Sequence, residues 1–349
     1  MNDHSVPAAA VGINPNFNFS NLNAAQNTGA AADTSLLLRR SATQCLRDAS
    51  SMTSPRMLFG EFWFEGELCI LFSDSNVGKS ILAVQIGESV AANQAIAPLK
   101  LEAPQQPVLY FDFELSDKQF ENRYSVDYIK HYDFNPNLHR IIINPNHIIP
   151  SHYPDFDAYL NWAIEKEIVE TGAVILIIDN ITYLRNETEN ARNALPLMKH
   201  LKALKSKYNL SILALAHTPK RDASKPITRN DLQGSKMLMN FCDSSFTIGE
   251  STQDNTLRYL KQIKQRNTEQ LYGSNNVCLF RIVKPVNYLK YDFEAFGREY
   301  EHLKEADGDD HRAKQKEDAA WLRAEGFKIR EIAEQLNISK SKADRLLNS

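Results

Sequence analysis

The chain has 349 residues, 43% of them hydrophobic and 24% charged, with a formal net charge of −3 at pH 7. This composition is that of an ordinary globular protein and excludes a wholly disordered chain, a collagen and a disulfide-stabilised miniprotein. No stretch approaches the roughly eighteen unbroken apolar residues of a membrane span, and we expect neither a membrane segment nor a secretory signal. Because the net charge is slightly negative, any surface that binds nucleic acid must be local.

The four cysteines, Cys45, Cys69, Cys242 and Cys278, lie far apart and form no CxxC pair. Zinc sites and disulfide frameworks need closer or paired spacing, so we predict reduced structural thiols and a cytoplasmic protein.

The length exceeds what one hydrophobic core usually serves and predicts two units, one of them small. We predict the following parts in chain order: a disordered tail over 1–34, a short helical lead-in over 35–56, the main domain over 57–300, a charged linker over 301–314 and a helical unit over 315–349.

Short apolar runs alternate with helical patterns through most of the main domain, which is typical of an α/β fold with a mostly parallel sheet covered by helices. The predicted strands are Glu67–Phe72, Val108–Phe113, Arg140–Asn144, Val174–Ile178 and Ser211–Ala216. The predicted helices are Ser80–Ala92, a stretch after Ser116, Ala158–Glu170 and Ala191–Tyr208. Three further strands follow without intervening helices, so we expect an antiparallel end to the sheet: Phe246–Gly249, Thr256–Gln262 and Val277–Val283.

The segment of residues 73–80, SDSNVGKS, follows a strand and opens a helix. It matches the phosphate-loop pattern GxxxxGK[ST] except that Ser73 replaces the first glycine. Backbone N–H groups of such a loop, here including Asn76 and Val77, wrap the phosphates of a nucleotide, and Gly78 permits the tight turn. Lys79 would reach the β and γ phosphates, and Ser80 would offer its hydroxyl to Mg²⁺. The sequence therefore predicts a site for ATP and Mg²⁺.

Polar residues at the ends of other strands would complete this site. Asp179 ends a buried strand beside the loop, where a carboxylate would hold the water shell of Mg²⁺. Glu114 follows another strand and would activate the attacking water, and Asp112 remains its competitor for this role. His217 ends a third strand and would contact the γ-phosphate.

Together the loop, FDFELS at 111–116, the strand ending at Asp179 and the AHT of 216–218 resemble the RecA/DnaB-type ATPase core, and most of all the plasmid RepA-type hexameric helicases. The resemblance covers roughly 57–283. It implies a RecA-like fold, ATP and Mg²⁺ as cofactors, a homo-oligomeric ring and the roles assigned above to each residue.

The segment of residues 260–267, LKQIKQRN, is similar to the KxR element of DnaB-like rings. The resemblance implies that Lys264 and Arg266 reach the γ-phosphate of the neighbouring subunit, where a cation stabilises the charge of the transition state. A solvated basic strand is the alternative.

Two basic regions are candidates for DNA contact. The loop that follows His217 corresponds to a loop that binds single-stranded nucleic acid in RecA-like rings. A plain solvated loop is the alternative. Its cations are Lys220, Arg221, Lys225 and Arg229. The C-terminal unit resembles the helix-turn-helix of resolvases, with Ser339 as the N-cap of its last helix, although a small helical bundle that binds protein is also possible. Its candidate duplex contacts are Lys340, Ser341, Lys342 and Arg345.

The sequence thus predicts an ATP-dependent, ring-forming DNA motor that acts in replication of a plasmid or mobile element. The alternative is a DNA-binding regulator that a bound nucleotide switches without unwinding. A small-molecule kinase ranks last, because neither an acceptor pocket nor an arginine-rich lid is evident.

Overall fold

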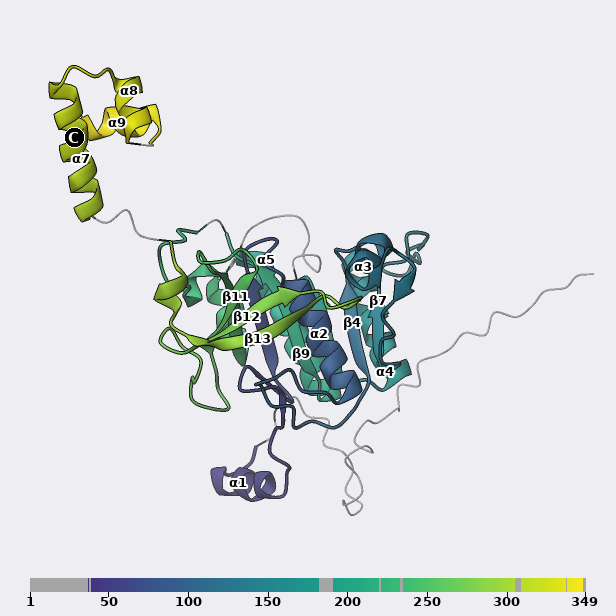
Figure 1. Ribbon diagram of the computed structural model, residues 1–349. Helices are drawn as coiled ribbons and strands as arrows, with labels where there is room; N and C mark the ends of the chain where they lie inside the picture. The colour runs from purple at the N-terminus through teal and green to yellow at the C-terminus, as the bar shows by residue number, and fades with distance from the viewer. Residues whose placement is uncertain are drawn as a thin grey trace, which may run out of the picture.

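A nine-stranded sheet forms the centre of the protein in the computed structural model, which describes residues 37, 39–181, 191–219, 221–232, 235–304, 309–336 and 338–347. The strand order is β13-β12-β11-β10-β3-β9-β8-β4-β7. The strands from β10 to β7 run parallel, and β11, β12 and β13 run antiparallel. The phosphate-loop strand β3 lies between β10 and β9, inside the parallel part (Figure 1).

The strands of this sheet are β3 (Leu68–Ser73), β4 (Val108–Asp112), β7 (Leu138–Ile141), β8 (Ile175–Asp179), β9 (Ser211–His217), β10 (Ser244–Glu250), β11 (Leu257–Lys264), β12 (Val277–Val283) and β13 (Lys290–Gly297). Two small antiparallel pairs accompany it: β1 (Met57–Phe59) with β2 (Trp63–Phe64), and β5 (Ser125–Val126) with β6 (Lys130–His131). The helices are α1 (Ala42–Ser50), α2 (Lys79–Ala92), α3 (Asp117–Arg123), α4 (Phe156–Thr171), α5 (Ala191–Tyr208), α6 (Ser235–Phe241), α7 (Asp309–Ala324), α8 (Ile329–Gln335) and α9 (Lys340–Leu347), with 3₁₀ turns η4 (Arg229–Asp231) and η5 (Glu299–His302).

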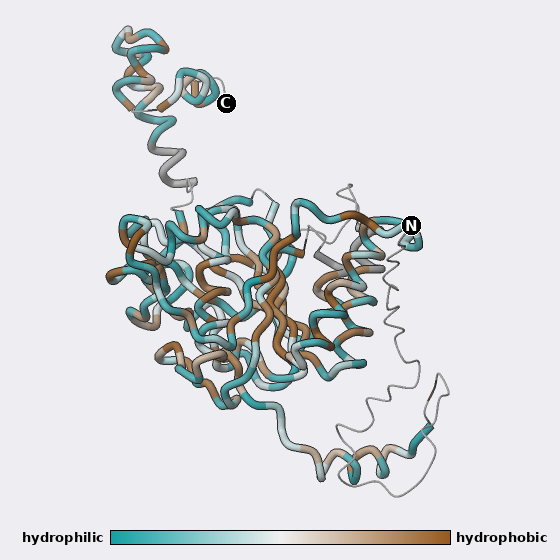
Figure 2. Tube along the Cα trace, turned by 90° about the vertical axis from the view of Figure 1, so that its right-hand side faces the viewer, coloured by the Kyte–Doolittle hydropathy of each residue, from teal (hydrophilic) through white to brown (hydrophobic). Residues whose placement is uncertain are grey.

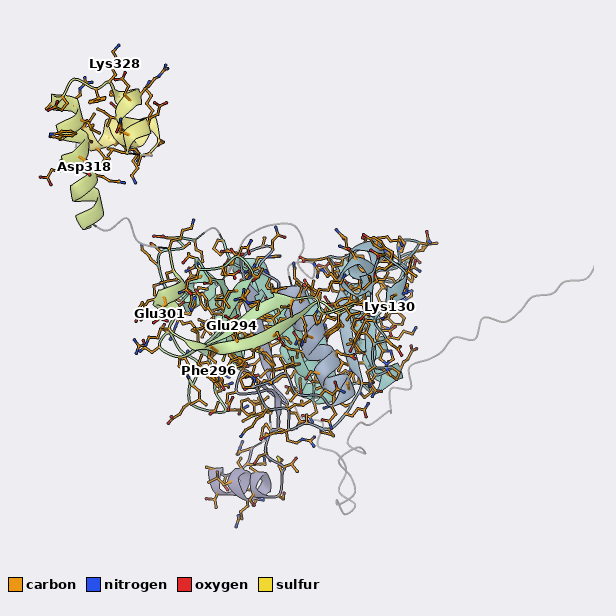
Figure 3. The ribbon with its side chains drawn as sticks, viewed as in Figure 1. Lys130, Glu294, Phe296, Glu301, Asp318 and Lys328 are labelled. Carbon is orange, nitrogen blue, oxygen red and sulfur yellow. The ribbon has the colours of Figure 1, made fainter. Side chains whose placement is uncertain are left out.

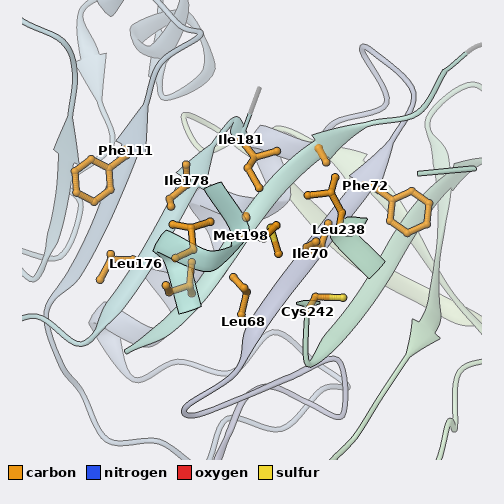
Figure 4. Close-up of a cluster of buried hydrophobic side chains, with 14 of the residues drawn as sticks. Leu68, Ile70, Phe72, Phe111, Leu176, Ile178, Ile181, Met198, Leu238 and Cys242 are labelled. Carbon is orange, nitrogen blue, oxygen red and sulfur yellow. The ribbon is translucent and has the colours of Figure 1, made fainter. Parts of the chain in front are cut away.

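Helices cover both faces of the sheet, so the central strands are apolar throughout. Along β3, alternate side chains enter opposite cores: Ile70 packs with residues of α4, α5 and α6 (Figure 4), and Leu71 packs with residues of α2. Burial of each such side chain contributes about 1.5–3 kcal/mol. The apolar strands lie in the middle of the molecule (Figure 2). Polar residues follow at the carboxyl ends of the parallel strands, so these residues lie together on one side of the sheet.

The structure confirms the α/β fold with a RecA-like, mostly parallel sheet and antiparallel strands at its end. Two details differ from the prediction. The strand over Phe246–Gly249 is β10, which pairs antiparallel with β11 as expected but also pairs parallel with β3. A further antiparallel strand, β13, was not predicted, although its buried or half-buried positions alternate with exposed ones, among them Glu294 and Phe296 (Figure 3). Alternation of this kind is the pattern of a half-exposed strand.

The C-terminal helices α7, α8 and α9 share a small core of their own. The predicted last helix is α9, which begins directly after Ser339, and the Ser339 hydroxyl accepts a hydrogen bond from the Lys342 N–H at 3.3 Å, as an N-cap does. Helix α7 begins at Asp309 and thus inside the segment predicted as a linker, because acidic and basic residues are compatible with an exposed helix. The predicted tail over 1–34 lies outside the described residues.

Three of the cysteines, Cys69, Cys242 and Cys278, are buried free thiols, and Cys45 is exposed on α1. No helix among the described residues is both long and apolar enough to cross a membrane.

Gly249 and Tyr259 lie opposite each other on β10 and β11, and a Cβ at position 249 would overlap the buried tyrosine ring. We therefore expect Gly249→Ala to lower the free energy of unfolding by about 1–3 kcal/mol through overpacking. Gly273→Ala is the matched control, because nothing lies within 4 Å of a Cβ there. Equal urea midpoints for the two variants would contradict this account of the strand pair.

Candidate nucleotide site

The phosphate loop joins β3 to the N-terminus of α2. Asn76 and Gly78 have φ values of 65° and 109°, which place both in the left-handed region. A Cβ on residue 78 would also lie 2.5 Å from the Tyr291 hydroxyl, so glycine is required there on two counts. Ser73, at the position where the pattern has glycine, is not among the residues with positive φ. A serine is therefore compatible with this loop.

Distant strands hold the loop in place. The Val77 carbonyl accepts hydrogen bonds from Arg258 Nε at 2.9 Å and from the Tyr291 hydroxyl at 3.1 Å. The Thr218 N–H, just after β9, donates to the Ser73 carbonyl at 3.1 Å. No sequence pattern points to Arg258 and Tyr291, because they lie 181 and 214 positions after Val77 and belong to no motif.

Lys79 is buried at the start of α2, and its ammonium group folds back over the loop. Nζ donates to the carbonyls of Ser73 at 3.0 Å and Asp74 at 2.8 Å, and it lies 3.2 Å from His217 Nδ1. Burial lowers the pKa of Lys79 to about 8, although Asp179, Glu114 and Asp74 act in the opposite direction. The cation is therefore under-compensated and suited to an added anion such as a phosphate.

Asp179 ends β8 and is completely buried beside the loop. Its Oδ2 accepts a hydrogen bond from the Tyr110 hydroxyl at 2.7 Å, and among the described residues Oδ1 has no hydrogen-bond partner of regular geometry. Burial raises the pKa of Asp179 to about 6, with Glu114 and Asp112 adding to the effect and the nearby hydroxyls of Ser80 and Tyr110 opposing it.

These residues fit a bound Mg²⁺. The ion prefers oxygen ligands and keeps several waters, and the Ser80 hydroxyl and the Asp179 carboxylate offer such oxygens at the loop. Ser80 would hold the ion directly and Asp179 through water. The ion would neutralise charge on the β and γ phosphates.

Glu114, Asn180 and His217 converge where the γ-phosphate of a nucleotide held by Lys79 would lie. His217 Nε2 lies 3.3 Å from Glu114 Oε1 and 3.0 Å from Asn180 Nδ2, which itself contacts the same glutamate oxygen. The hydrogen bond from His217, together with the charges of His217 and Lys79, lowers the pKa of Glu114. No sequence motif singles out Asn180, although it directly follows Asp179.

Asp112, the competitor of Glu114, is fully engaged elsewhere. Its Oδ1 accepts from the backbone N–H groups of Glu114 and Leu115, and its Oδ2 accepts from Arg140 Nε at 2.8 Å. A carboxylate with these partners positions the turn that carries Glu114.

Lys264 and Arg266 do not lie at this site. Lys264 Nζ donates to backbone carbonyls at the end of α6, and Arg266 pairs with Asp243 at 3.1 Å. The Asp243 N–H donates to the carbonyl of Leu68, five residues before Ser73, so about 17 Å of β3 separates Arg266 from the loop. These cations therefore lie at the opposite end of the strands, where the parallel strands begin.

The basic residues of the loop after β9 differ in exposure. Lys225 and Arg229 are exposed, and Lys220 lies outside the described residues. Arg221 is only 11% exposed and lies 3.8 Å from Asp231, so it faces the protein rather than solvent. On α9, Lys340, Ser341 and Arg345 are exposed and Lys342 is half-buried.

The sheet, the phosphate loop and the carboxylate Asp179 beside it define a P-loop ATPase. The family described as "AAA domain", AAA_25, matches residues 33–223, and the chain belongs to this family. No curated protein matches the sequence significantly. Among solved structures, a KaiC-like protein of the hyperthermophilic archaeon Pyrococcus horikoshii OT3 is 13% identical, with a TM-score of 0.46, over 66% of this chain and 90% of that one.

The pKa of Asp179 in the folded protein, about 6, lies above the ordinary value of 3.8. An acid whose pKa is raised by folding adds to the free energy of unfolding. This added stability is fully present at low pH, below the unfolded pKa, and is lost as the pH rises through the folded pKa. The difference corresponds to about 3 kcal/mol. Asparagine does not titrate, so we expect the free energy of unfolding of nucleotide-free Asp179→Asn, relative to wild type, to rise by up to about 3 kcal/mol from pH 4 to pH 8.

Urea denaturation at several pH values measures this gain. Asp127→Asn is the control, because residue 127 is exposed and asparagine also tolerates its φ of 52°. A pH-independent difference between Asp179→Asn and wild type would contradict the expectation.

Proposed function

We propose that this P-loop ATPase is a ring-forming motor that hydrolyses ATP with Mg²⁺, moves on single-stranded DNA and unwinds duplex DNA. It would act in the cytoplasm, in replication of a plasmid or mobile element. The observation that carries the proposal is the convergence of Glu114, Asn180 and His217 beside Lys79, because a site that only bound a nucleotide would not need these groups.

Each residue has a role in hydrolysis. Lys79 and the backbone of residues 73–80 bind the phosphates. Glu114, held in place by the turn around Asp112, accepts the proton of the attacking water. His217 contacts both Lys79 and Glu114, so a change at the γ-phosphate reaches the strand β9 and the loop that follows it.

The position of Lys264 and Arg266 supports a ring. Arg266 lies about 17 Å and Lys264 about 10 Å along β3 from the phosphate loop of their own chain, and Arg266, although paired with Asp243, is half exposed to solvent. In a head-to-tail assembly, one edge of each subunit faces the opposite edge of the next. The pair would then complete a neighbour's active site, and a hexamer is the assembly we favour.

Two surfaces would contact DNA. The exposed Lys225 and Arg229 lie in the loop after β9 and would bind the phosphates of single-stranded DNA without sequence preference. The C-terminal helices, as a helix-turn-helix, would bind duplex DNA through Lys340, Ser341, Lys342 and Arg345 on or beside the start of α9.

A nucleotide-switched DNA-binding regulator is the second candidate, and one contact favours it. The Lys304 N–H, on the segment that leads to the C-terminal helices, donates to the Ala223 carbonyl at 3.2 Å. The loop after His217 is thereby joined to the attachment of the C-terminal unit. A nucleotide could act on that unit through this contact without any unwinding.

Steady-state ATP hydrolysis with and without single-stranded DNA separates the two candidates. We expect single strands to stimulate hydrolysis several-fold in wild type, and Lys79→Ala to abolish it. Lys166→Ala, on the exposed surface of α4, is the matched control and should behave as wild type. Glu114→Gln should bind nucleotide normally and lose about 10²–10⁴-fold in turnover. Tight nucleotide binding with negligible turnover in wild type would favour the regulator.

Mixing two inactive variants tests the shared site. Arg266→Ala supplies an intact phosphate loop and Lys79→Ala supplies an intact Arg266, so equal mixing should restore about a quarter of the interfaces in a ring. The restored ATPase rate should rise and fall with the mixing ratio. No recovery at any ratio would show that Arg266 does not act on a neighbour.

A further inference from the structure

A cleft of about 410 Å³ lies on the α2 side of the sheet. Its walls are the second half of α2, the loop after that helix and the beginning of β13, which crosses α2 (Figure 1). This volume is in the range of small-ligand sites. Glu88 in its wall follows Lys79 by nine residues, about 14 Å along the helix, so the cleft is separate from the nucleotide site.

Glu88 brings an uncompensated negative charge into the cleft. Its side chain belongs to a residue that is 8% exposed, and it accepts hydrogen bonds only from neutral donors: the Asn135 N–H at 3.1 Å and the Tyr132 hydroxyl at 3.2 Å. Within the part of the chain that the structure describes, no cation pairs with it. Burial raises the pKa of Glu88, and the charge of Asp133 raises it further.

Aromatic rings form much of the remaining wall. Tyr132 and Tyr288 have ring centroids 4.2 Å apart, and Phe293 lies on the β13 side. The lysine of the wall, Lys290, is already neutralised by Asp292 at 2.9 Å. Glu88 and Asp292 against Lys290 leave the lining with a net charge of −1. Aromatic faces around a carboxylate attract organic cations.

The C-terminal end of α2 adds to this preference. The helix ends at Ala92 with Asn93 in the left-handed region, and its last turn carries no basic residue. The carbonyl end of a helix is the negative end of its dipole and favours cations. Gln94 and the following residues carry this end directly into the cleft wall.

We propose that this cleft binds an alkyl ammonium or guanidinium group, with Glu88 as its ionic partner and Tyr132, Tyr288 and Phe293 as its aromatic walls. Two sources carry this chemistry: a free polyamine-type compound, or a lysine or arginine side chain of a second copy of the chain. Residues 1–36 contain neither lysine nor arginine and cannot supply that side chain. The proposal does not depend on the proposed DNA motor.

Calorimetric titration of the full chain with agmatine, at about 0.15 M salt to screen surface charge, tests the site. We expect one site for agmatine and none for 1,4-butanediol, an uncharged alcohol with the same four-carbon chain. Glu88→Gln should weaken agmatine binding at least tenfold, and Tyr288→Leu should weaken it several-fold. Glu170→Gln removes the same charge from an exposed position on α4 and should bind as wild type.

Absence of agmatine binding by wild type would overturn the proposal, and so would unchanged affinity in Glu88→Gln. If Glu88→Gln fails to fold, unchanged affinity in Tyr288→Leu serves the same purpose. Sedimentation velocity with agmatine then distinguishes the sources. Dissociation of oligomers by agmatine would identify a second copy as the natural source, whereas binding at unchanged sedimentation would identify a free amine.

Discussion

The burial of two opposite charges at the carboxyl edge of one parallel sheet is the constraint on which the site depends. Lys79 and Asp179 are both withdrawn from water, and burial shifts the pKa of each against its charged form. Loop carbonyls and the hydroxyls of Tyr110 and Ser80 compensate only in part. A phosphate and a divalent cation would supply the missing partners, so ligand binding and the stability of this edge are linked.

Strand direction determines at which end of the strands each proposed catalytic residue lies. Parallel strands end together, so β3, β8 and β9 bring the loop, Asp179 and His217 to one edge. Strand β11 runs in the opposite sense and delivers Lys264 and Arg266 to the other. In the proposed ring, the two groups of residues on one chain would belong to two different sites, each completed by a neighbouring subunit.

The same sheet also connects the nucleotide site to the surfaces proposed for DNA. His217 touches both Lys79 and Glu114 and is followed by the loop that carries Lys225 and Arg229. That loop is anchored by a buried ion pair, since Glu299 binds Lys261 at 2.5 Å and accepts the Ile227 N–H at 2.7 Å. Residues just after Glu299 lead to the C-terminal helices. In the proposed motor, a change at a bound γ-phosphate would therefore reach both surfaces through few contacts.

Local pattern was sufficient for much of the fold and for the motif at its centre. Hydrophobic periodicity and helix- or strand-breaking residues are sufficient to predict the bounds of Ala191–Tyr208 and Val277–Val283. The motif of residues 73–80 likewise identifies the phosphate loop. Each of these patterns lies within one short stretch of the chain. Only the tertiary structure shows that Arg140 pairs with Asp112, which leaves Glu114 to face the site. The contacts of Arg258 and Tyr291 with Val77, and the inward orientation of Arg221, likewise come from the tertiary structure alone. Each of these depends on packing between segments far apart in the sequence, and no local period records which distant side chains will meet.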